Sequence, residues 1–195
     1  MPLPHGRLII LLAVIAYLSI SLVACNDAER CDLKVEQAPA IRRIKLGKTV
    51  AEINSLFPKP LIPNPKLPVE PYGYSQERVW GVGVPQLEGI DELELSFLDG
   101  RVFSIRIKYK DEAVPRDKRA FLARVMESLG LADVWGNSGN KDRVDCYGFY
   151  LSILHRAPGG TFLELTDVDR KLEFSLRSSK EFERVQEEKR RKFNP

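Results

Sequence analysis

The sequence predicts an α+β fold, in which an antiparallel sheet of two hairpins carries helices on one face. Two stretches of alternating apolar and polar residues, 91–110 and 144–167, predict the hairpins. Two stretches with the apolar spacing of amphipathic helices, 49–57 and 117–129, each precede one hairpin. This order predicts tandem helix-then-hairpin units, followed by a charged C-terminal helix at 178–195.

Residues 1–24 have the composition of an export signal. Arg7 supplies a basic start, and residues 8–24 carry no charge and are mostly Leu, Ile, Val and Ala. The run is short for a helix that must span about 30 Å of hydrocarbon, and its basic flank favours a secretory signal peptide. The alternative is an uncleaved signal anchor in which Cys25 is an ordinary buried cysteine.

The segment Leu22-Val23-Ala24-Cys25 resembles the lipobox of bacterial lipoproteins, which has a Leu, two small or aliphatic residues and then Cys. The resemblance implies that cleavage falls between Ala24 and Cys25 and that Cys25 becomes the lipidated first residue. Two or more acyl chains hold a protein stably on a bilayer. The resemblance therefore implies a membrane-anchored protein of the bacterial cell envelope that faces the periplasm. Asn26, where enterobacterial lipoproteins retained in the inner membrane have Asp, favours the outer membrane.

Two cysteines, Cys31 and Cys146, remain besides Cys25. An even number of cysteines in an exported chain is typical of disulfides, so a Cys31–Cys146 bridge is one interpretation. Two free buried thiols are the alternative. We expect no metal, because lipidation would use one thiol and no Cys or His pair follows at the spacing of a zinc site. No sequence feature calls for a cofactor.

The charge of the exported chain is close to balanced. Removal of residues 1–24 takes one of the 30 basic side chains and leaves all 27 acidic ones. Nucleic-acid binders carry a dense basic face, so we expect no nucleic-acid partner. The length suits one domain with a real core. We expect a polar lipid tether at 25–40, an α+β domain at 41–177 and the charged helix after it.

The first elements of the domain are expected at 41–57. Residues 41–47 predict a short strand. Thr49 and Glu52 have the spacing of a capping box, in which each side chain binds an exposed amide at a helix start. Pro58 ends the predicted helix. Its apolar face consists of Val50, Ile53, Leu56 and Phe57.

The residues Gly47, Thr49, Glu52 and Ile53 resemble the Gly-Met-Thr-x-x-Glu-Val motif of the SmpA/OmlA outer-membrane lipoproteins, with Lys48 in place of the usual Met. The resemblance covers about a dozen residues. It implies two helices packed on a three-stranded antiparallel sheet, and an accessory role in the assembly of outer-membrane proteins.

A proline-rich segment with six prolines follows at 58–71. Such a run favours polyproline II or a stiff loop. It predicts a long surface loop, with a ligand for a partner as the alternative. Three aromatic residues come next, Tyr72, Tyr74 and Trp80. We expect them either to pack against the sheet or to form an exposed aromatic surface that binds a partner.

The hairpin at 91–110 has its apolar side chains at odd positions in both strands. A two-residue Asp-Gly turn would set odd positions against even ones, whereas a three-residue loop 98–100 sets odd against odd. We therefore predict the three-residue loop, with Leu95 opposite Phe103 and Glu92 opposite Arg106. The second hairpin is expected from strands 144–156 and 161–167, after a loop at 135–143.

No catalytic constellation stands out. Cys146 and His155 lie nine positions apart on one predicted strand, which places them on opposite faces. The acidic group Glu164, Asp167 and Asp169 predicts a strand-end turn rather than a metal cluster. We therefore expect a non-enzymatic envelope domain that binds a protein partner or assists assembly. The alternatives are an inhibitor of an envelope enzyme and a hydrolase with an unrecognised site.

Overall fold

The computed structural model describes residues 31–66, 72–81, 83–131, 136–138, 141–156 and 160–193. The chain divides into two units at residue 31, and the fold below is that of the second unit. The expected signal peptide, its cleavage site and Cys25 lie outside the described residues. None of the described helices is both long enough and apolar enough to span a membrane.

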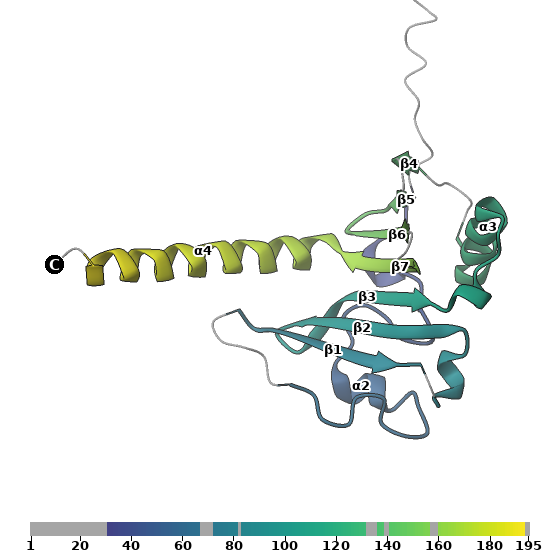
Figure 1. Cartoon of the computed structure of the whole chain (residues 1–195), viewed down its shortest axis with the longest axis horizontal. Helices are drawn as coiled ribbons and strands as arrows, with labels where there is room; N and C mark the ends of the chain where they lie inside the picture. Colours follow the sequence, from purple (N-terminus) through teal and green to yellow (C-terminus); the bar gives the residue numbers. More distant parts are fainter. Residues whose placement is uncertain are drawn as a thin grey trace, which may run out of the picture. The chain divides into compact units, whose positions relative to one another are not determined.

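The sheet has seven strands in the described part of the chain, and the pairs with an assigned register are antiparallel. Its order is β1-β2-β3-β7-β6-β5-β4, so the last strand lies at the centre beside β3 (Figure 1). The predicted α+β class with an antiparallel sheet is confirmed. The strands are β1 (Tyr74–Trp80), β2 (Ile90–Leu98), β3 (Arg101–Tyr109), β4 (Gly136–Ser138), β5 (Lys141–Asp145), β6 (Phe149–Arg156) and β7 (Gly160–Asp167).

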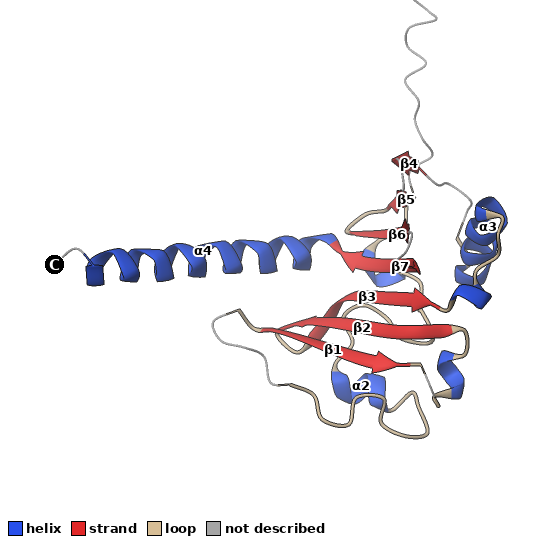
Figure 2. Cartoon of the chain, in the orientation of Figure 1, coloured by secondary structure: helices blue, strands red, loops and turns tan. Residues whose placement is uncertain are grey.

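Three α-helices accompany the sheet in the described residues: α2 (Val50–Asn54), α3 (Lys118–Leu129) and α4 (Val168–Phe193) (Figure 2). The capping box that begins α2 is present, because Glu52 N–H donates to Thr49 Oγ1 and Thr49 N–H donates to Glu52 Oε2. Asp117 caps α3, and Gly130 ends it with a left-handed backbone. Short 3₁₀ turns lie at Val35–Gln37, Pro85–Leu87 and Asp111–Ala113.

The core lies on one face of the sheet, under α2 and α3. Alternate positions of the central strands are buried there, including Leu95, Ile105, Leu165 and Leu151, which lie on four neighbouring strands. The helices add apolar side chains to the same cluster, which are Ile53 of α2 and Phe121, Leu122, Val125 and Met126 of α3. Burial of this surface is the main favourable term in folding.

The β2–β3 hairpin differs from the predicted register. Leu98 pairs with Arg101 across a two-residue turn, in which Asp99 and Gly100 both have positive φ. A bulge follows, after which Leu95 faces Ile105 rather than Phe103. The predicted three-residue loop is therefore wrong. The extra residue that sets odd against odd positions lies in the bulge and not in the turn.

Residues 31–47 also differ from the prediction. Ile41 and Ile44 are buried and hydrogen-bond to each other across a turn in which Arg42 and Arg43 have positive φ, so no strand forms at 41–47. Ala38 is buried in the core cluster. Residues 31–40 thus belong to the folded unit and not to a free tether, although they are polar in composition.

The second half of the chain holds three further differences. The predicted strand 144–156 is interrupted after Asp145, and Gly148 has a positive φ of 83° in the break. The predicted loop 135–143 contains β4 and the start of β5. The last helix begins at Val168 and not at 178, directly after β7. Asp167 allows this early start, since its side chain accepts from Arg170 N–H at 2.9 Å.

Candidate functional site

An open groove lies between α4 and the start of β1, with a volume of about 640 Å³. Tyr74 and Phe174 stack at its base, with 4.4 Å between ring centroids. Phe182 stands 63% exposed on the helix side. The lining residues are Tyr72, Tyr74, Phe174, Ser178, Ser179, Phe182 and Glu183.

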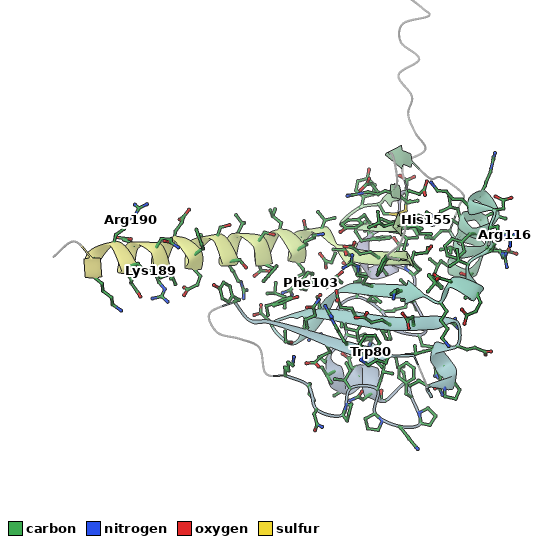
Figure 3. All side chains as sticks on the ribbon, viewed as in Figure 1. Trp80, Phe103, Arg116, His155, Lys189 and Arg190 are labelled. Atoms are coloured by element: carbon green, nitrogen blue, oxygen red, sulfur yellow. A yellow bond between two sulfur atoms is a disulfide. The ribbon has the colours of Figure 1, made fainter. Side chains whose placement is uncertain are left out.

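The bulge in β3 supports this groove from below, because it places Phe103 against the aromatic rings that line it. Because a bulge inserts one residue, Val102 joins the core while Phe103 faces the other side of the sheet. There Phe103 lies 6.2 Å from the ring of Tyr74 and 6.1 Å from that of Phe174. Figure 3 shows Phe103 close to the first turns of α4. The irregularity that sequence reasoning placed in the turn therefore shapes the groove.

The β2–β3 turn fastens α4 beside the groove. Arg177 donates to both carboxylate oxygens of Asp99 at 2.9 Å and also contacts Glu173. Arg170 adds a longer contact to Asp99 at 3.7 Å. The Arg177 guanidinium lowers the pKa of Asp99, so the carboxylate stays charged well into acid.

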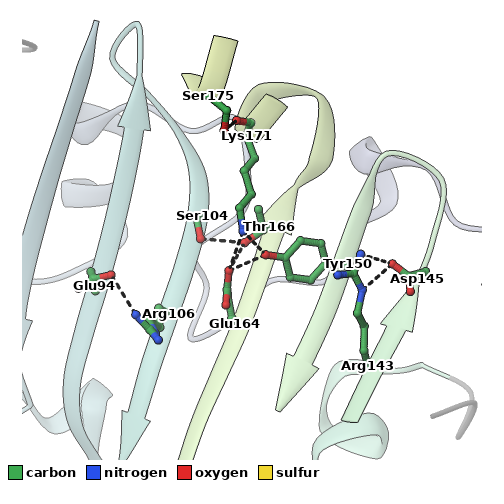
Figure 4. A network of polar contacts seen from close by, with 10 residues as sticks. All are labelled: Glu94, Ser104, Arg106, Arg143, Asp145, Tyr150, Glu164, Thr166, Lys171 and Ser175. Atoms are coloured by element: carbon green, nitrogen blue, oxygen red, sulfur yellow. Dashed lines mark hydrogen bonds and ion pairs between the residues drawn. The ribbon is translucent and has the colours of Figure 1, made fainter. Parts of the chain in front are cut away.

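A polar network holds the first turn of α4 on the outer face of the sheet (Figure 4). The Tyr150 hydroxyl donates to Glu164 at 2.6 Å and accepts from Lys171 Nζ at 2.6 Å. Thr166 donates to the same carboxylate and bonds Ser104 across β3 and β7. Burial disfavours the charged form of Lys171, but Tyr150 and the charge of Glu164 outweigh it and raise its pKa. The network therefore ties the start of α4 to β6 and β7 and has a structural role.

A smaller hollow of about 170 Å³ lies over β1–β3, where the sequence predicted a charged outer face. Arg78 lies 3.4 Å from Glu92 and 3.2 Å from Glu94, and Lys108 bonds Asp91 at 2.7 Å. Glu92 pairs in register with Lys108 and not with Arg106 as predicted, because of the bulge. These contacts neutralise charge between neighbouring strands, which is what a solvated sheet face needs.

His155 does not form a nucleophile pair with cysteine. Its Nδ1 lies 3.1 Å from the Thr161 hydroxyl, and its ring meets Phe121 edge-on. Its buried Nε2 has no hydrogen-bond partner among the described residues. Burial and the nearby charge of Lys118 lower its pKa, so it is neutral at physiological pH. Lys118 itself binds the buried Asp142 at 2.9 Å, which ties α3 to β5.

Cys31 and Cys146 form a disulfide, the pairing that the sequence left open. Cys146 lies in the break between β5 and β6. Because its sulfur is bonded to Cys31, it is not available as a nucleophile. Two of the three acidic residues considered above have structural roles. Glu164 belongs to the Tyr150 network, and Asp167 caps α4. No set of three metal-binding side chains comes together in the part of the chain that the structure describes.

Sequence reasoning named Tyr72 and Tyr74 but did not connect them with α4. The spacing of Phe174, Ser178 and Phe182, four residues each, was the available signal for one helix face. Trp80 is exposed at the other end of β1 and does not line the groove (Figure 3).

Searches of protein-family models, curated proteins and solved structures found no match to this chain.

Proposed function

We propose that this chain is a lipid-anchored, non-enzymatic protein of the bacterial cell envelope that binds a protein partner in the groove beside α4. The observation that carries the binding role is the exposed Phe182 above the stacked pair Tyr74 and Phe174. Exposed aromatic side chains beside a preformed concavity are typical of anchor sites in protein interfaces. The lipobox segment that ends at Cys25 supports the lipid anchor.

The rigidity of the groove also supports a binding role. The Asp99–Arg177 pair and the Tyr150 network hold α4 from two sides, so a partner would meet a preorganised surface. We propose an apolar segment of an envelope protein as the occupant, with an aromatic or aliphatic side chain between Phe182 and Tyr72. We favour the outer membrane as the location and an accessory role in envelope assembly as the function.

We also propose that the fold consists of two tandem units. Helix α2 precedes β1–β3, and α3 precedes β4–β7. This arrangement keeps the helix-before-hairpin order of the sequence in both halves, with α2 and α3 both contributing to one core.

Crosslinking in the native envelope tests the binding role. A photo-reactive amino acid at Phe182 of the lipidated protein should capture a discrete partner, whereas the same group at exposed Glu127 on α3 should not. Phe182→Ala should weaken the complex without unfolding the domain, since the side chain is mostly exposed. Equal capture at both positions would exclude the groove as the binding site.

The lipid anchor has a separate test. Metabolic labelling with a fatty acid should mark the native protein, and Cys25→Ala should abolish the label. A Cys25→Ala chain that still takes up the label would contradict the anchor.

A further inference from the structure

The loop at Cys146–Gly148 is the place where the amino-terminal chain joins the fold. Cys31 is bridged to Cys146, and Tyr147 N–H donates to the Leu33 carbonyl at 2.9 Å. Six residue steps separate Cys31 from Cys25, and they reach about 20 Å at full extension. If Cys25 carries lipid as proposed above, this loop is held within that distance of the acyl chains.

The first residue of α4 lies beside the same loop. Val168 N–H donates to the Gly148 carbonyl at 2.8 Å. From there an apolar stripe runs along the helix, defined by Val168, Leu172 and Leu176, which follow one another at four-residue spacing and so share a side. Their exposed fractions are 38%, 57% and 54%, and that of Tyr147 is 63%. Exposed apolar side chains therefore begin where the tether is fastened.

This apolar stripe lies on the side of α4 opposite to Phe174, which stacks on Tyr74 at the start of the groove. Residues two apart on an α-helix point about 200° apart, so Leu172 and Leu176 point nearly opposite to Phe174. Arg190 follows Leu172 by about five full turns and therefore shares its side. Figure 3 shows Arg190 and Lys189 on opposite sides of the helix, with Phe103 below the helix on the side of Lys189.

We propose that Tyr147 and the apolar stripe rest in the headgroup region of the bilayer that holds the lipid anchor. The surface that covers these side chains is a membrane and not a second copy of the chain. The six residue steps from Cys25 to Cys31, together with the disulfide, keep the Cys146–Gly148 loop close to the bilayer. Apolar helix faces bind shallowly at the boundary between headgroups and acyl chains, and tyrosine favours that boundary because one end of the ring is polar. The stacked pair Tyr74 and Phe174 then lies on the side of α4 away from the membrane, where a partner can reach it.

Quenching by brominated lipids tests this orientation. The lipidated protein carries Trp80→Phe and Trp135→Phe, and a single tryptophan replaces Tyr147 or Leu172, or Phe174 on the opposite side of α4 as the matched control. In vesicles of dibrominated phosphatidylcholine, fluorescence should fall on the order of twofold for the first two and stay unchanged for the control, because bromine quenches only side chains at the acyl boundary.

Flotation of the same vesicles separates the two proposals. Loss of flotation would contradict the lipid anchor itself. Flotation without quenching at positions 147 and 172 would overturn the orientation while the anchor stands. Protection of position 172 together with chemical crosslinking between copies would likewise overturn it, because the apolar stripe would then be covered by a second molecule.

Discussion

Reduction of the Cys31–Cys146 bridge should remove a large share of the stability of this domain. The bridge joins residues 115 positions apart, and strands β1–β5 lie within the loop that it closes. In the chain-entropy treatment, closing a loop of that length in the unfolded state contributes about 5 kcal/mol. A domain of this size has a total stability of about 5–15 kcal/mol, so the reduced protein should be only marginally folded.

Urea denaturation measures this loss. The protein without residues 1–24 and with Cys25→Ala is unfolded with and without a reductant, followed by circular dichroism. The midpoint should fall sharply on reduction, and the Cys31→Ser/Cys146→Ser variant should match the reduced protein and ignore the reductant. A loss below about 1 kcal/mol would refute the reasoning, because loop closure would then contribute little.

Three smaller predictions follow from local geometry. Thr49→Ala should lower the free energy of unfolding by about 1 kcal/mol in thermal melts, because it removes the cap of α2; no change would show that the cap is dispensable. Gly73→Ala should cost about 1–2 kcal/mol, because φ is +60° and the new Cβ would lie 2.4 Å from Asp99 Oδ1; the control Gly47→Ala, also at positive φ but with open space, should cost less, and equal losses would contradict the contact argument. Arg177 lowers the pKa of Asp99, so the pair stabilises the protein above the ordinary aspartate pKa and loses its effect as the pH falls through the lowered value. In acid titrations, the difference in unfolding free energy between the native protein and Asp99→Asn should therefore shrink below about pH 4. A difference that stays constant with pH would show that the pair does not contribute to stability.

Local signals predicted the elements that local interactions define. Helix α3 ends where Asp117 and Gly130 cap it, and α2 begins at the capping box of Thr49. The odd-position core of β2 and β3 also follows from alternation, because burial of one face admits no other parity. Alternation does not distinguish a longer loop from a tight turn with a bulge, and the bulge is what places Phe103 against Tyr74 and Phe174.

The remaining differences come from tertiary contacts. Residues 31–40 are polar in composition, yet Ala38 is buried because the disulfide and the Tyr147 contact hold the segment against the fold. The early start of α4 was not predicted because Leu172 and Leu176 face solvent, so the first turns lack the one-sided apolar burial on which the prediction depended. The groove could not be predicted, since it joins β1 to a helix about a hundred residues later in the chain.

The strand order divides the sheet into two contiguous pieces of chain. Strands β1–β3 come before the connection at 110–117 and strands β4–β7 come after it, and the two sets meet only along the β3–β7 ladder. A protease cut in this connection would break no strand pairing. The fragments would stay covalently joined through Cys31 and Cys146, which lie on either side of the cut. We therefore expect a nicked chain to migrate as one species until it is reduced, so that in an oxidising compartment the bridge also protects the domain against a single cleavage.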